Sequence, residues 1–172
     1  MRILAASDIH GSIGWAQQIA DRFYAEKADK LLLLGDLLYH GPRNKLPQDY
    51  DPQAVTELLN SMRNSIIAVR GNCDTEVDQM VLKFPIMADY AYIVSGSLVI
   101  FATHGHVYNP SHMPECLSSG SILLCGHTHI VADEVIEGGI RYMNPGSPSI
   151  PKNGSVPSYI IIEDGHAEIK AF

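Results

Sequence analysis

Short apolar runs, each followed at once by glycine or a polar residue, constrain the fold of this chain most. In the first 70 residues, strand-like runs at 2–6, 31–34 and 65–69 alternate with helical patterns at 13–26 and 52–62. Apolar residues in the first helical pattern recur near a period of 3.6, and Asp51 with Pro52 forms a helix start before the second. This βαβαβ order favours parallel strands joined by right-handed crossovers.

The second half of the chain indicates antiparallel pairing instead. Residues 90–94 and 98–102 flank Ser95-Gly96-Ser97 and are expected to form a hairpin. Further strands are predicted at 122–125, 131–136, 140–143, 159–163 and 167–171, with turns at 137–139 and 164–165. We therefore expect an α/β fold in which two sheets pack face to face with helices outside, and one domain spanning residues 1–172.

Composition fits a globular protein rather than a membrane or disordered one. The chain has 172 residues, of which 46% are apolar and 18% charged. No stretch approaches the roughly 20 apolar residues that a membrane helix requires. The first apolar run is interrupted by Ser7, Asp8 and His10, and is too short and polar for the core of a signal peptide. A cytoplasmic protein without membrane attachment is expected.

Cysteine count and charge exclude several classes of site. Cys73, Cys116 and Cys125 form an odd set without C-x-x-C spacing, so neither a disulfide framework nor a thiolate zinc site is expected. The net charge is −7 without a basic cluster, whereas binders of long nucleic acid need basic residues to neutralise phosphates. A small phosphate ester remains possible, because bound metal ions would supply the positive charge.

Metal-capable side chains recur directly after predicted strands. Asp8 and His10 follow the first strand, and five more residues follow four others: Asp36, Asn72, His104, His127 and His129. Ligands of open α/β sheets collect outside the carboxyl ends of strands, so these seven residues are expected to form one site. Each short motif alone could be ordinary turn chemistry, and Gly71-Asn72 could simply tolerate left-handed backbone; their common position after strands favours metal binding.

The residue types fit phosphoryl-transfer chemistry. Carboxylate, amide and imidazole ligands suit Mn²⁺, the ion we expect, or alternatively Fe²⁺, Ni²⁺ or Zn²⁺. Two ions about 3.5–4 Å apart can hold the attacking and leaving oxygens, and can generate hydroxide near neutral pH. Asp36 is the natural bridging carboxylate, and Asn72 can also donate a hydrogen bond to a phosphate oxygen. Asp36 and Asn72 are therefore the expected catalytic residues.

The ordered motifs resemble those of the calcineurin-like metallophosphoesterases. They stand here as Asp8-Ile9-His10, Gly35-Asp36, Gly71-Asn72, Thr103-His104 and Gly126-His127-Thr128-His129. Segments 36–47, 70–80 and 144–151 look like the small bacterial phosphodiesterases of the YfcE type. The resemblance implies a four-layer αββα sandwich of two mixed sheets flanked by helices. It also implies one metal ion held by Asp8, His10, Asp36 and His129, and another by Asp36, Asn72, His104 and His127.

One position departs from the family pattern. Many members carry histidine where Cys73 stands, and that histidine is thought to protonate the leaving group. Because a thiol has a pKa near 8.5, we expect a preference for good leaving groups, although Cys73 could simply fill space. In the long loop 37–51, Arg43 could meet a phosphate or be solvated, and His106 could point into the cleft or lie on the surface.

The predicted function is hydrolysis of small phosphodiesters at a dinuclear metal centre. A non-catalytic metal-binding scaffold on the same fold, as in the small subunit of retromer, and a nuclease are the alternatives. A cyclic nucleotide could be the substrate, although no nucleobase signature stands out. Exposed hairpin edges and the aromatic residues of the first helix suggest a homodimer.

Overall fold

Two five-stranded mixed sheets form the centre of the computed structural model, which describes residues 1–172. The first sheet has the order β10-β9-β1-β2-β3. Its strands are β1 (Ile3–Ala6), β2 (Lys30–Leu33), β3 (Ile66–Ala68), β9 (Ser158–Glu163) and β10 (His166–Ala171). As the βαβαβ pattern predicts, β1, β2 and β3 are parallel, whereas β9 pairs antiparallel with both β1 and β10.

The second sheet has the order β4-β5-β6-β8-β7. Its strands are β4 (Tyr90–Ser95), β5 (Leu98–Thr103), β6 (Ile122–Leu124), β7 (Val131–Ile136) and β8 (Ile140–Pro145). The expected hairpins β4–β5 and β7–β8 are antiparallel, while β5, β6 and β8 run parallel to one another. Parallel strands inside the second sheet were not evident from the sequence.

Three α-helices accompany the sheets: α1 (Ile13–Ala25), α2 (Pro52–Ser61) and α3 (Glu76–Val81). Ser12 caps α1 by accepting a hydrogen bond from the Trp15 amide, and Asp51 caps α2 by accepting one from Ala54. The sequence did not suggest α3, a short helix opened by a capping box between Thr75 and Asp78. Two short 3-10 helices, η1 (Arg63–Ser65) and η2 (Glu137–Gly139), complete the set. No helix is long and apolar enough to cross a membrane.

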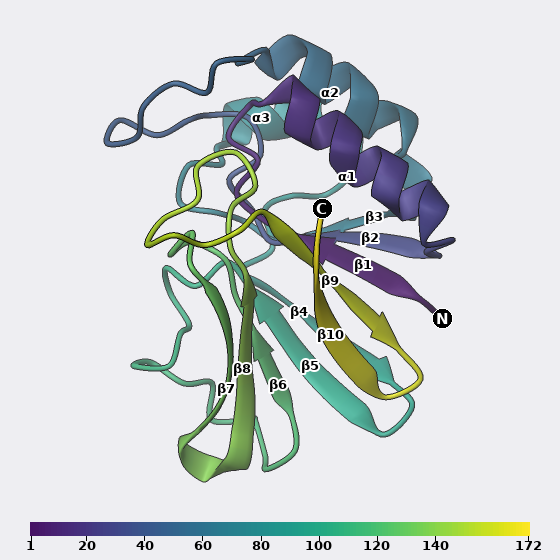
Figure 1. The fold of residues 1–172 in the computed structure, drawn as a ribbon, viewed down its shortest axis with the longest axis vertical. Helices are drawn as coiled ribbons and strands as arrows, with labels where there is room; N and C mark the ends of the chain where they lie inside the picture. Colours follow the sequence, from purple (N-terminus) through teal and green to yellow (C-terminus); the bar gives the residue numbers. More distant parts are fainter.

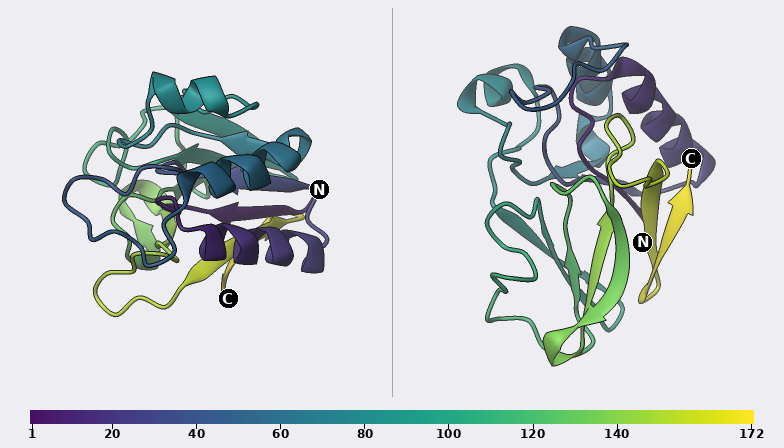
Figure 2. Two further views of the ribbon diagram at one scale, coloured as in Figure 1. Left: turned by 90° about the horizontal axis from the view of Figure 1, so that it is seen from above. Right: turned by 60° about the vertical axis from the view of Figure 1, so that its left-hand side comes forward.

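Both sheets carry apolar residues on their two faces, so another layer of the protein packs against each face. Leu4 and Ala6 of β1 pack against the helices, whereas Ile3 and Ala5 pack against the second sheet. The helices therefore cover one face of the first sheet, and the second sheet covers the other (Figure 1). In the right-hand view of Figure 2 the second sheet extends away from the helices.

The expected α/β sandwich of two mixed sheets is confirmed, and its fourth layer is made by a loop. Phe101, Leu123 and Tyr142 lie on the outer face of the second sheet, where Tyr108, Met113 and Leu117 of the β5–β6 connection cover them. This connection carries two prolines, Pro110 and Pro114, and forms turns rather than a helix. All three α-helices accordingly lie with the first sheet.

Candidate metal centre

All seven predicted ligands lie in loops that follow the carboxyl ends of strands. Asp8 and His10 follow β1, Asp36 follows β2 and Asn72 follows β3; from the other sheet, His104 follows β5, and His127 and His129 follow β6. Because β1–β3 are parallel, and β5 is parallel to β6, these ends meet at one edge of the sandwich. The site is therefore built from both sheets.

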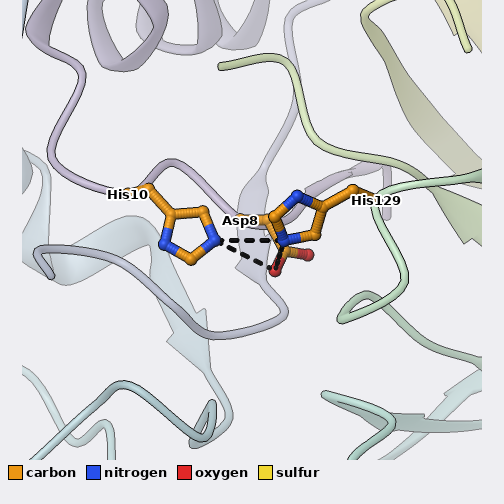
Figure 3. Close-up of side chains that lie close together, drawn as sticks. All are labelled: Asp8, His10 and His129. Atoms are coloured by element: carbon orange, nitrogen blue, oxygen red, sulfur yellow. Dashed lines mark hydrogen bonds and ion pairs between the residues drawn. The ribbon is translucent and has the colours of Figure 1, made fainter. Parts of the chain in front are cut away.

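Asp8, His10 and His129 form the first half of the site (Figure 3). The Nε2 atoms of the two histidines are 3.1 Å apart. Asp8 Oδ1 lies 3.6 Å from His10 Nε2 and 3.2 Å from His129 Nε2. All three side chains are buried, so three potential ligand atoms converge on one point inside the protein.

His104, Asn72 and His127 form the second half of the site. His104 Nε2 lies 3.0 Å from Asn72 Oδ1 and 3.2 Å from His127 Nδ1. Asp36 connects the halves, because its Oδ2 is 3.7 Å from His10 Nε2 and 3.5 Å from His104 Nε2. Asn72 is exposed and His127 half-buried, so the site opens to solvent on this side.

Hydrogen bonds fix the orientation of three imidazoles. The Nδ1 atom of each ring faces a main-chain carbonyl oxygen. The His10 ring faces the carbonyl of Tyr39 at 2.8 Å, the His129 ring faces the carbonyl of Ile150 at 2.8 Å, and the His104 ring faces the carbonyl of Leu34 at 2.6 Å. A carbonyl can only accept, so each Nδ1 carries the proton, and in the neutral ring Nε2 is left with a lone pair. Metal-bound histidines usually have such a partner on their second nitrogen.

These contacts fit divalent cations. The Nε2 lone pairs of neutral His10 and His129 would face each other at 3.1 Å, which is repulsive unless a cation lies between them. Asp8 Oδ1 is buried without any hydrogen-bond partner, which is costly for a carboxylate oxygen. The seven predicted ligands offer oxygen and imidazole donors, a mixture that suits Mn²⁺, Fe²⁺, Ni²⁺ or Zn²⁺.

Neighbouring charges favour binding-competent charge states at two of the predicted ligands, Asp8 and His127, but not at His10. Burial acts to raise the pKa of Asp8, but the imidazoles of His104, His10 and His129 hold it below its ordinary value. Burial and the neighbouring His104 lower the pKa of His127, which favours the neutral, ligating imidazole. Burial opposes protonation of His10, yet Asp8 raises the pKa of His10. Metal binding at this histidine therefore competes with a proton.

The backbone at the ligands is strained. Eight non-glycine residues have positive φ, and five of them are predicted ligands: Asp8, His10, Asp36, His127 and His129. Left-handed backbone at a non-glycine residue costs of order 1–3 kcal/mol, and such residues cluster at functional sites. The surrounding hydrogen bonds hold the chain in this conformation and aim five side chains inward.

Asp74 positions two of the loops that carry predicted ligands, although no role was predicted for it. Its buried carboxylate accepts three main-chain hydrogen bonds, from Asp36 at 2.8 Å, Leu37 at 2.9 Å and Gly71 at 2.7 Å. Burial raises the pKa of Asp74, and the three donors act against that rise. The loops approach so closely that a Cβ on Gly71 would lie 2.1 Å from Asp36 Oδ1. The signal for Asp74 was its place within the motif Gly71-Asn72-Cys73-Asp74.

The loop after β8 supports Asp8 and the β6 loop. Ser147 and Ser149 donate hydrogen bonds to the Asp8 carbonyl at 2.7 Å and 3.0 Å. Asn144 donates to the Gly126 carbonyl at 2.7 Å and thereby holds the segment that leads to His127. These contacts give residues 144–149 a structural role beside the site.

A polar cavity of about 420 Å³ lies over the exposed half of the site. Asp36, Asn72, Cys73, His127 and His129 line it, together with Arg43 and Lys152 from two loops. Arg43 therefore borders the cavity, in line with the interpretation that it meets a phosphate rather than solvent. Lys152 is a second positively charged residue at the cavity, and it was not predicted from the sequence. His106 is half-buried beside His104 and does not line the cavity.

Cys73 lines this cavity and is buried. Its amide donates to Asp36 Oδ1 at 2.8 Å, and Asn72 Nδ2 lies 3.3 Å from its Sγ. Burial and the nearby Asp36 raise the pKa of the thiol to about 12. The thiol is therefore protonated at neutral pH, and it is too weak an acid to replace an imidazolium as proton donor.

Comparisons with known proteins agree with this geometry. The model of the calcineurin-like phosphoesterase superfamily domain matches residues 1–165. The chain is 44% identical to phosphodiesterase YfcE of Escherichia coli strain K12 over 164 residues, covering 95% of this chain and 88% of that protein. It is 31% identical to the probable metallophosphoesterase YsnB of Bacillus subtilis over 173 residues, covering 94% of this chain and 83% of that one. A solved structure of YfcE, described as a phosphoesterase from E. coli, superposes with a TM-score of 0.94 at 43% identity, covering 99% and 93% of the two chains.

Proposed function

Because the chain belongs to the calcineurin-like phosphoesterase superfamily, we propose that it is a metal-dependent phosphodiesterase that hydrolyses small phosphodiesters at a dinuclear centre. The observation that carries this proposal is the position of Asp36, whose Oδ2 lies 3.7 Å from His10 Nε2 and 3.5 Å from His104 Nε2. One carboxylate oxygen thus faces both halves of the ligand set. The name of the relative YfcE supports the substrate class.

The assignment of ligands is part of the proposal. Asp8, His10, Asp36 and His129 would hold one divalent ion, and Asp36, Asn72, His104 and His127 the other. Two bound ions would supply positive charge and the activation of water that phosphoryl transfer requires. Asp36 keeps the two halves in register, since Cys73 and Asp74 restrain its carboxylate and its amide.

Side chains around the polar cavity bind the diester. Arg43 and Lys152 carry positive charge at the cavity and favour an anionic substrate. The Asn72 side chain is exposed, and its Oδ1 faces His104. Its Nδ2, which lies near Cys73, can therefore donate a hydrogen bond to a phosphate oxygen. The chain places no acid of suitable pKa at Cys73, so the leaving group must depart unaided. Diesters of acidic alcohols, such as aryl esters, are the expected substrates.

Hydrolysis of bis-p-nitrophenyl phosphate by Mn²⁺-loaded protein tests the proposal. We expect Asp36→Ala and His104→Ala each to lower kcat/KM at least about 100-fold, because even supporting residues of metal sites cost 10–100-fold. The matched control is His166→Ala, which removes an exposed histidine of β10 and should leave the rate unchanged. Absence of turnover in clean, metal-loaded protein would favour the non-catalytic scaffold. Cleavage of DNA in preference to small diesters would favour the nuclease.

Four further assignments accompany the proposal. We propose Mn²⁺ as the working ion, with Fe²⁺, Ni²⁺ and Zn²⁺ as alternatives that metal analysis of purified protein distinguishes. We propose a cytoplasmic protein that acts as one domain over residues 1–172 and forms a homodimer. Tyr24 on α1, with 65% of its surface exposed, and Tyr92 on the edge strand β4, with 51%, offer apolar contacts for a second copy. Sedimentation at several concentrations tests the dimer.

A further inference from the structure

An apolar cavity of about 460 Å³ lies beside the polar one. Its apolar walls come from the loop after β2, the start of α2 and the helix α3, and they consist of Leu38, Tyr39, Tyr50, Pro52, Val77 and Val81. Its volume falls within the range of small-molecule sites. Val77 and Val81 are 67% and 48% exposed and form its open side.

Cys73 is the residue that both cavities share. Its Sγ belongs to a group with ligand atoms of His10 and Asp36 in which all atoms lie within 4.8 Å of one another. The main-chain carbonyl of Tyr39, another wall of the apolar cavity, holds His10 Nδ1 at 2.8 Å. The apolar cavity therefore begins about one side chain away from the proposed metal ligands.

The two cavities differ in what they can bind. The polar cavity contains Arg43 and Lys152, whereas no lysine or arginine lines the apolar one. The single charged residue there is Asp78, whose Oδ2 already accepts hydrogen bonds from the amide and hydroxyl of Thr75. A second phosphate would meet no positive charge in this place. For an uncharged apolar group, transfer from water into this cavity would be favourable.

We propose that the apolar cavity binds an aromatic substituent of the phosphodiester while the phosphate lies at the metal ligands. This inference rests on the proposed function and names the substrate class of the same site. A flat ring suits the cavity, because the rings of Tyr39 and Tyr50 line it and both pack edge-on against His40, at centroid distances of 4.8 and 5.4 Å. The cavity thus selects for the aryl esters that a site without a proton donor can hydrolyse.

Two inhibitors that differ only in the ring test the inference. Phenylphosphonate and methylphosphonate share a phosphonate group, so their inhibition constants against bis-p-nitrophenyl phosphate compare the ring with a methyl group. We expect phenylphosphonate to inhibit Mn²⁺-loaded protein at least about tenfold more tightly, given the apolar area that a buried ring removes from water. Val81→Trp, which fills the cavity, should bring the ratio of the two constants close to one.

The controls separate this inference from the proposed function. Val135→Trp makes the same change at an exposed valine of β7, and it should leave the ratio as in the unmodified protein. If Val81→Trp fails to fold, Val77→Asp places a charge in the cavity at the first turn of α3, where acidic residues are favourable, and should also lower the ratio. Equal inhibition constants in an active enzyme, or a ratio that both cavity variants leave unchanged, would overturn the inference alone. Failure to hydrolyse any diester would contradict the proposed function and the inference with it.

Discussion

Replacing Asp74 by asparagine tests how the ligand loops are held in place. Asp74 Oδ2 accepts hydrogen bonds from the amides of Asp36 and Gly71, and Oδ1 accepts one from Leu37. An asparagine can keep its oxygen at the Oδ2 position and retain two of these bonds. Its NH₂ group then faces the Leu37 amide, and two donors meet in a buried place.

The magnitude follows from this count. Asp74→Asn loses one hydrogen bond to a charged group, worth about 1.5–3 kcal/mol, and leaves a buried amide unpaired at about 1–3 kcal/mol. These terms overlap, so we expect a loss of about 2–4 kcal/mol in the free energy of unfolding. Asp74→Ala leaves three buried amides unpaired, at about 1–3 kcal/mol each, and should cost more than Asp74→Asn. For a chain of this size the asparagine variant should melt about 5–15 °C lower.

Urea unfolding and metal titration measure the two consequences. We expect Asp74→Asn to weaken Mn²⁺ binding about 10- to 100-fold as well, because it releases the loop that carries Asp36. Asp164→Asn, at an exposed turn residue with φ of 48°, is the control and should change stability by less than about 0.5 kcal/mol. An Asp74→Asn protein with unchanged stability and unchanged Mn²⁺ affinity would refute the positioning role.

Three other predictions concern the missing acid, the metal ions and a salt-bridge cluster. Cys73→His should raise kcat for diesters with poor leaving groups by about tenfold or more, toward the 10²–10⁴-fold of general acid catalysis, with little gain for aryl esters; parallel changes on both substrates would contradict it. Chelation of the two metal ions should lower the melting temperature by about 10–20 °C if each was present at 100 times its dissociation constant, where each ion contributes about 2.7 kcal/mol, and calorimetry with and without EDTA measures this. Burial acts to raise the pKa of Glu26, but Arg2, Tyr159 and Lys170 hold it at about 2, below its ordinary 4.5; the stability that Glu26 contributes is therefore present above pH 4.5 and is lost as the pH falls toward 2. The difference in unfolding free energy between Glu26→Gln and the unmodified protein should accordingly shrink from pH 7 to pH 3.5, and a difference that grows on acidification would refute the linkage.

Local patterns were sufficient for most elements but not for their neighbours. The helices α1 and α2 and all ten strands lie close to the predicted residues, because periodicity and caps are local properties. The position of β9 beside β1 depends on contacts such as that of Leu4 with Ile161, which no local pattern encodes. The helix α3 was missed because it is only six residues long and buries no residue.

The ligand residues of the candidate site could be predicted from the sequence, but the residues that support them could not. Ligand residues were recognisable because each follows a strand and because their order resembles a family pattern. Asp74 and Lys152 were missed, because in a sequence neither a buried aspartate that holds main-chain amides nor a lysine beside a cavity differs from any other residue of its type. Their roles depend on residues distant in sequence, such as Asp36, 38 positions from Asp74, and Asn72, 80 positions from Lys152. Geometry of this kind appears only once the loops are placed in space.

The pairing of β9 with β1 has a consequence for synthesis on the ribosome. β1 emerges roughly 150 residues before Ser158–Glu163, the strand that pairs with its outer edge. At about 5–20 residues per second, roughly 150 intervening residues take about 8–30 s, during which this edge lacks its partner. Exposed strand edges are templates for aggregation. The nascent chain should therefore need protection by a chaperone for longer than a protein whose sheet closes in chain order.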